Sequence, residues 1–88
     1  MSIAGENKFF VYLLRCSDGT LYCGWTMNLE KRLAAHNSRR GGAKYTRARR
    51  PVELVYFEEH ENKRSALKRE YEIKHMTRKE KLLLASKI

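Results

Sequence analysis

The chain has 88 residues, and its 19 lysines and arginines against 10 acidic residues give a formal net charge of +9. A chain of this length predicts one small domain over residues 1–88, with a core at about 9–85 and a flexible terminus at 1–7. The positive charge favours a polyanionic partner, nucleic acid before an acidic protein or a lipid surface. Apolar runs are too short to span a membrane, a signal peptide is not recognisable, and two cysteines are too few for a secreted disulfide framework, so we expect a cytoplasmic protein.

Aromatic and branched residues predict two strands near the N-terminus, at Phe9–Arg15 and Leu21–Thr26. The Ser-Asp-Gly sequence between them, at 17–19, fits a three-residue turn with glycine in the left-handed region. Because side chains alternate along a strand, this odd loop would pair Tyr12 with Gly24 and place Tyr12 and Tyr22 on one face of the sheet. An even loop would separate the two tyrosines.

The same odd register sets the directions of the two cysteines. Cys16 and Cys23 would then face opposite sides of the sheet, which argues against a disulfide between them.

A helix is predicted at about 28–37, with Asn28 as its N-cap. Leu29 and Leu33 supply its apolar stripe. Arg32 and His36, four positions apart, share a neighbouring stripe.

Residues 38–50 are predicted to form a loop with six basic residues and no acidic one. This composition suits contact with phosphates and base stacking, although such a run is also typical of a solvated surface. The residues that we expect to contact nucleic acid are Arg39, Arg40, Lys44, Tyr45, Arg47, Arg49 and Arg50.

A third strand is predicted at residues 52–58, after Pro51. We expect Val52, Leu54 and Tyr56 on one face. Apolar residues also lie between them, which predicts that both faces of this strand are covered.

Two further helices are predicted, at 62–75 and from Thr77 onward, where Thr77 and Glu80 fit a capping box. Leucines 82–84 are expected to close the core. These elements predict an α/β (α+β) fold with a small central three-stranded, mainly antiparallel sheet flanked by helices.

Several polar residues allow both a structural and a chemical interpretation. Strand tyrosines such as Tyr12 and Tyr22 ordinarily pack in a core. Arg32 fits a solvent-exposed helix surface as well as a phosphate site. Glu70 lies beside the apolar stripe of its helix and needs a partner, either Lys74 or a nearby arginine if its role is structural.

Taken in order, these residues resemble the GIY-YIG endonuclease superfamily over about residues 10–74. The resemblance is carried by Phe10-Val11-Tyr12, Tyr22-Cys23-Gly24, Arg32, His36 and the segment from Ala66 through Glu70 to Ile73 and Lys74. The chain departs from the family pattern at Phe10, which replaces a glycine, and at Trp25, where several members carry lysine.

The resemblance implies catalytic roles for Tyr12, Tyr22, Arg32, His36 and Glu70. Tyr22 would act as the general base or orient the attacking water, with Tyr12 beside it. Arg32 would neutralise developing charge, His36 would relay a proton or bind phosphate, and Glu70 would hold one Mg²⁺ or Mn²⁺ ion.

The function implied by the resemblance is a divalent-metal-dependent nuclease that hydrolyses DNA phosphodiester bonds, in DNA repair or processing. The alternatives are a nucleic-acid-binding module with weak or no cleavage, and a basic scaffold for an acidic protein. Many superfamily members choose targets through an attached domain, so this chain would use its own surface or a protein partner.

Overall fold

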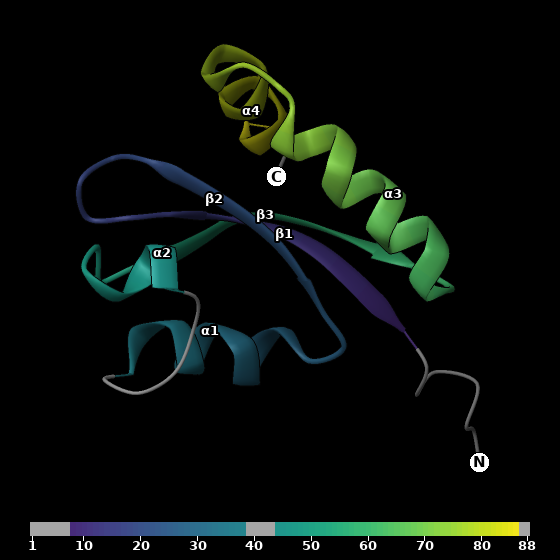
Figure 1. Ribbon diagram of the computed structural model, residues 1–88, viewed down its shortest axis with the longest axis horizontal. Helices are drawn as coiled ribbons and strands as arrows, with labels where there is room; N and C mark the ends of the chain where they lie inside the picture. Colours follow the sequence, from purple (N-terminus) through teal and green to yellow (C-terminus); the bar gives the residue numbers. More distant parts are fainter. Residues whose placement is uncertain (1–7, 39–43, 87–88) are drawn as a thin grey trace.

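The computed structural model describes residues 8–38 and 44–86. Within them lies a three-stranded antiparallel sheet of order β2-β1-β3. The elements are β1 (Phe9–Arg15), β2 (Leu21–Thr26), α1 (Leu29–Asn37), α2 (Lys44–Arg47), β3 (Glu53–His60), α3 (Lys63–Lys74) and α4 (Arg78–Ala85). Helices α1 and α2 cover one face of the sheet, and α3 and α4 cover the other (Figure 1). The predicted fold class is confirmed.

The β1–β2 hairpin has the predicted register. Tyr12 pairs with Gly24 across the strands. Gly19 has a φ of 86°, in the left-handed region that glycine adopts without strain, and its amide donates to the carbonyl of Cys16 at 2.9 Å. Tyr12 and Tyr22 therefore lie on the α1 face of the sheet.

Both cysteines are free thiols and buried. Cys16 belongs to the apolar cluster on the α1 face, and Cys23 belongs to the cluster under α3 and α4. The prediction that they face opposite ways is confirmed.

Strand β3 differs from the prediction in its faces. Leu14 pairs with Leu54, but the preceding Leu13 pairs with Tyr56, so a bulge places Val55 as an extra residue in β3. Leu54 therefore packs on the α1 face, whereas Tyr56 packs under α3 and α4. The expected shared face for Val52, Leu54 and Tyr56 is wrong, because an inserted residue reverses the alternation of side chains beyond it. Apolar packing on both faces is confirmed.

The predicted loop at 38–50 contains a single helical turn, α2. Its four residues are too few to show a helical repeat of apolar positions, so sequence periodicity could not reveal it. The turn nevertheless reaches the interior, since Thr46 is fully buried.

Helix α4 has the predicted capping box, and α3 is capped by Asn62, at the predicted start of that helix. The Asn62 side chain accepts a hydrogen bond from the Ser65 amide, and Thr77 and Glu80 form the capping box. Of leucines 82–84, however, only Leu84 is buried, whereas Leu82 and Leu83 are 42% and 59% exposed. Consecutive residues on a helix point in different directions, so this run could place only part of its side chains in the core.

Candidate active site

The site is built around Tyr12, in the central strand. Its ring crosses the backbone of Gly24 on β2: a Cβ atom at Gly24 would lie 2.6 Å from the Tyr12 hydroxyl and 2.8 Å from Cζ. The tyrosine is only 2% exposed. Gly24 thus provides the space that this ring occupies.

We expect Gly24→Ala to destabilise the fold and to displace the Tyr12 ring. Overpacking a buried position of this kind costs about 1–3 kcal/mol in the free energy of unfolding. Denaturant unfolding measures the cost, and the chemical shifts of the Tyr12 ring report the displacement. Gly19→Ala is the matched control: Gly19 has a positive φ, but a Cβ atom there would meet no other atom within 4 Å, so the change should destabilise without moving Tyr12. Unchanged Tyr12 shifts in Gly24→Ala would contradict the packing argument.

Two side chains of helix α1 contact Tyr12, and Tyr22 of strand β2 packs beside them. The Tyr12 hydroxyl lies 2.9 Å from Nε2 of His36, and Nε of Arg32 donates to the same hydroxyl at 3.4 Å. The Tyr22 ring packs edge-on against the His36 ring, with centroids 5.3 Å apart. The structure therefore brings together four of the five predicted catalytic residues.

Burial determines the protonation of the central pair. It raises the pKa of Tyr12 to about 12, although the hydrogen bond from Arg32 acts in the opposite direction. Burial, and secondarily the charge of Arg32, lowers the pKa of His36 to about 4. Both groups are therefore neutral near pH 7, and neither carries charge beside the Arg32 guanidinium.

Arg32 also reaches the surface. An open hollow of about 230 Å³ is lined by Thr26, Asn28, Lys31, Arg32 and Ala35, at the end of β2 and the start of α1. Two cations line this hollow, which makes it attractive to a phosphate group. Arg32 thus links the surface to the buried Tyr12 hydroxyl.

Glu70 comes from the other side of the sheet. It lies on α3, its backbone oxygen accepts from the Cys23 thiol at 3.9 Å, and its carboxylate is 3.3 Å from Nζ of Lys74. The Glu70 side chain is 16% exposed, so its pairing with Lys74 is partly shielded from water. Among the residues that the structure describes, no three His, Cys, Asp or Glu side chains form a group that could hold a metal ion.

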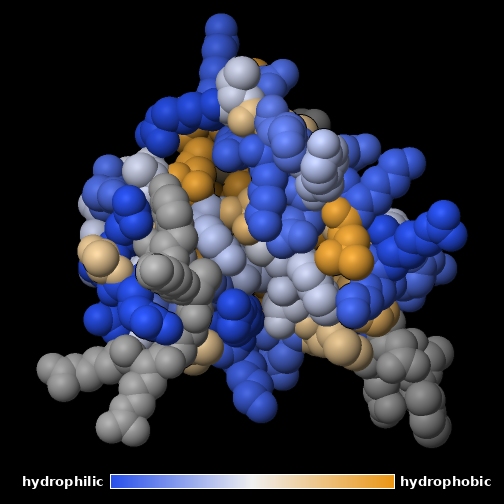
Figure 2. All heavy atoms as spheres, in the orientation of Figure 1, coloured by the Kyte–Doolittle hydropathy of each residue, from blue (hydrophilic) through white to orange (hydrophobic). Residues whose placement is uncertain are grey.

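The predicted nucleic-acid contacts are only partly visible. Arg39 and Arg40, and the side chains of Lys44 and Tyr45, lie outside the described residues. Arg47 is exposed on α2. Figure 2 shows hydrophilic side chains over most of the visible face, with the hydrophobic ones in small separate patches.

The last two arginines of the basic segment make contacts within the protein. Arg49 forms an ion pair with Asp18 at 3.0 Å, and Arg50 donates to the carbonyl of Ser38. The first contact ties the segment to the turn between β1 and β2, and the second ties it to the C-terminal end of α1.

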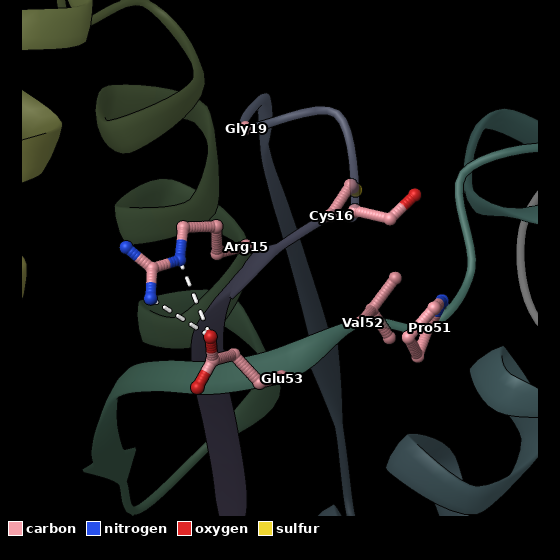
Figure 3. Close-up of a pocket in the computed structure, with 7 residues that line it drawn as sticks. Arg15, Cys16, Gly19, Pro51, Val52 and Glu53 are labelled. Atoms are coloured by element: carbon pink, nitrogen blue, oxygen red, sulfur yellow. Dashed lines mark hydrogen bonds and ion pairs between the residues drawn. The ribbon is translucent and has the colours of Figure 1, made fainter.

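A cavity of about 440 Å³ lies at the hairpin end of the sheet, away from the tyrosines. Arg15 and Glu53 point toward each other across it, joined at 2.8 Å, while Cys16 and Val52 lie on its other side (Figure 3). None of the predicted catalytic residues lines this cavity.

Comparisons with known proteins identify the family. The GIY-YIG catalytic domain matches residues 8–82. The chain belongs to the GIY-YIG family. It is 62% identical over 77 residues to a UPF0213 protein of Clostridium perfringens, covering 88% of this chain and 82% of the relative. It is 58% identical over 78 residues to a UPF0213 protein of Syntrophus aciditrophicus, covering 89% of this chain and 90% of the relative.

The fold is similar to the solution NMR structure of a UPF0213 protein from Bacillus halodurans. The TM-score is 0.58 and the identity 42%, over 90% of this chain and 83% of the other. The three-stranded antiparallel sheet with flanking helices is thus the fold of this GIY-YIG relative as well.

Sequence reasoning missed one residue that contacts this cluster of side chains. The Thr46 hydroxyl lies 2.9 Å from Nδ1 of His36, opposite the Tyr12 contact. A single threonine among basic residues carries no pattern that predicts burial. The signal lies only in the three-dimensional approach of α2 to α1.

Over residues 8–38 and 44–86, no helix is long and apolar enough to cross a bilayer.

Proposed function

We propose that this GIY-YIG protein is a divalent-metal-dependent nuclease that hydrolyses DNA phosphodiester bonds. The observation that carries the proposal is the buried Tyr12–His36 pair, hydrogen-bonded to an arginine that also lines a basic surface hollow. Packing of the core alone does not require a buried phenol that accepts a hydrogen bond from an arginine. A phosphate site needs a fixed cation of this kind.

The hollow beside Arg32 is the proposed place of the scissile phosphate. Strand β2 is an outer strand of the sheet, so a phosphodiester along its edge is accessible from both faces. Arg32 and Lys31 would approach the phosphate from the α1 side. Glu70, on α3, would approach it from the other side.

The two tyrosines would have different roles. Tyr12 is enclosed and neutral, so it would act by holding Arg32 and His36 in place. Tyr22 is half-buried and packs against His36, and it would be the phenol that orients the attacking water. Arg32 would stabilise the charge that develops on the phosphate oxygens.

Glu70 would hold the metal ion. Magnesium is often bound through one or two carboxylates with waters and phosphate oxygens, so a single glutamate fits its chemistry. When bound, the ion would act as a Lewis acid that stabilises charge on the leaving oxygen. The half-exposed Lys74 ammonium at Glu70 would have to swing aside, which an exposed lysine does at little cost.

A nucleic-acid-binding module with little or no cleavage is the second candidate. The pairing of Glu70 with Lys74 favours it, because the carboxylate is already neutralised within the protein. Trp25, at the position where several family members carry lysine, favours it too. Both candidates use the same positive charge to bind DNA.

Cleavage assays with added metal separate the two candidates. Branched, nicked, single-stranded and double-stranded DNA would be incubated with Mg²⁺, with Mn²⁺ and with chelator. We expect cleavage with metal only, and a loss of cleavage in Tyr22→Phe, which keeps the ring packing and removes the hydroxyl. Salt-sensitive DNA binding without cleavage by any preparation would support the binding module. Cleavage of equal rate in wild type and Tyr22→Phe would remove Tyr22 from the mechanism.

The setting of this activity is also a proposal. Two buried free thiols support a reducing compartment, which fits the cytoplasm and a role in DNA repair or processing. A protein partner would supply targeting where the chain's own surface does not.

A further inference from the structure

Thr46 occupies an unusual position for a residue in a basic surface segment. It is fully buried, and its hydroxyl lies 2.9 Å from Nδ1 of His36. We propose that Thr46 is a positioning residue that holds the proton of His36 on Nδ1, so that Nε2 accepts from the Tyr12 hydroxyl. This inference rests on the proposed function only for its effect on cleavage, since the position of the proton is a property of the free protein.

The direction of each hydrogen bond follows from the donor at one end. The guanidinium of Arg32 can only donate, so the Tyr12 oxygen accepts from its Nε. Within the described part of the chain, the Tyr12 hydroxyl has one other partner, Nε2 of His36. The phenol is protonated near neutral pH, so it donates its hydrogen to Nε2.

Because Nε2 accepts a hydrogen bond, the protonation of the other ring nitrogen, Nδ1, is determined as well. A neutral imidazole carries one N–H, so the proton lies on Nδ1 and is donated to the Thr46 oxygen. A doubly protonated His36 would place a second cation next to the Arg32 guanidinium inside the fold, and its pKa of about 4 excludes that state near neutral pH. Arg32, Tyr12, His36 and Thr46 thus form one directed chain of hydrogen bonds.

This chain connects two separate parts of the molecule. Thr46 belongs to α2, in the basic segment, whereas Arg32 lines the proposed phosphate hollow. Removing the Thr46 hydroxyl takes away the acceptor that stabilises a proton on Nδ1. Its other tautomer would direct a second donor at the Tyr12 oxygen and leave the phenol hydrogen without its acceptor, which is costly in a buried site. The hydrogen bond from Arg32 Nε to the Tyr12 hydroxyl would then weaken, and Arg32 would be less firmly positioned.

Nitrogen-15 NMR of the imidazole measures the tautomer directly, in the labelled full chain without DNA or metal. His36 in the wild type should show a protonated Nδ1 and an unprotonated Nε2. Thr46→Ser keeps the hydroxyl and should give the same pattern. Thr46→Val keeps the shape and removes the acceptor, so the proton should move in part or fully to Nε2. Signals of His36 are assigned by their absence in His36→Gln.

The outcomes are distinct from those of the cleavage proposal. A wild-type protein with the proton on Nε2, or a Thr46→Val variant with an unchanged tautomer, would overturn the assignment whether or not the protein cleaves DNA. If it cleaves, Thr46→Val should lower kcat by about tenfold to a hundredfold with little change in KM, as loss of an outer hydrogen-bond partner does elsewhere. Thr46→Ser should restore it. If Thr46→Val does not fold, the wild-type and Thr46→Ser tautomers still decide the assignment.

Discussion

Replacing Glu70 with glutamine should lower metal-dependent cleavage by about two to three orders of magnitude. Stabilisation of the transition state by a bound metal contributes several kcal/mol, and each ~1.4 kcal/mol is a factor of ten in rate. Glutamine keeps the size of the side chain and removes the charge that binds the ion. DNA affinity should be kept or rise, because a negative charge leaves a basic protein. Single-turnover cleavage and salt-matched binding measurements report the two effects.

Glu72→Gln is the control, since Glu72 lies on the same helix and pairs with Arg69 at 3.3 Å. It should cleave like the wild type. Lys74→Met should lower the Mg²⁺ concentration needed for half-maximal cleavage, because it removes the cation that competes for the Glu70 carboxylate. A large fall in melting temperature for Glu70→Gln, with cleavage unaffected per folded molecule, would instead assign Glu70 to a structural ion pair.

Arg32→Lys should cleave about a hundredfold or more slowly while binding DNA nearly normally. Lysine keeps the charge in the hollow but lacks the planar fork that donates to phosphate and, through Nε, to the Tyr12 hydroxyl. Loss of one fixed donor that stabilises transition-state charge has effects of about this size. The rate should therefore fall in kcat, with KM little changed.

Two variants separate this effect from a general change of charge. Arg15→Lys makes the same substitution at an exposed arginine paired with Glu53, outside the site, and should leave both binding and rate unchanged. Lys31→Ala removes a cation from the hollow beside Arg32. It should weaken DNA binding more than it lowers the rate at which bound DNA is cleaved. Equal rates for Arg32→Lys and wild type would make Arg32 a binding residue only.

The parts of the fold that depend on neighbouring residues could be predicted from the sequence. The Ser-Asp-Gly turn specified an odd loop, and the odd loop alone determined that Tyr12 and Tyr22 share a face. Asn28 and Thr77 marked helix starts because their side chains bond to amides only three residues away.

Features set by distant contacts could not be predicted. The bulge in β3 depends on how Leu13 and Leu14 pair with a strand some 40 residues later. The Thr46–His36 contact depends on α2 packing against α1. For Glu70, the helix was predictable, but its place across the sheet from the tyrosines was not.

The crossing of Tyr12 over Gly24 has a consequence for how such a domain diverges. Tyr12, Gly24 and His36 fill the interior, so selection for folding alone would retain them in a descendant that no longer cleaves anything. Arg32, Tyr22 and Glu70 reach the surface or its border, and they would drift freely once catalysis was abandoned. Among relatives, the tyrosine–glycine pair should therefore follow the fold, whereas on the proposed mechanism the arginine, the second tyrosine and the glutamate should be retained together only where cleavage is retained.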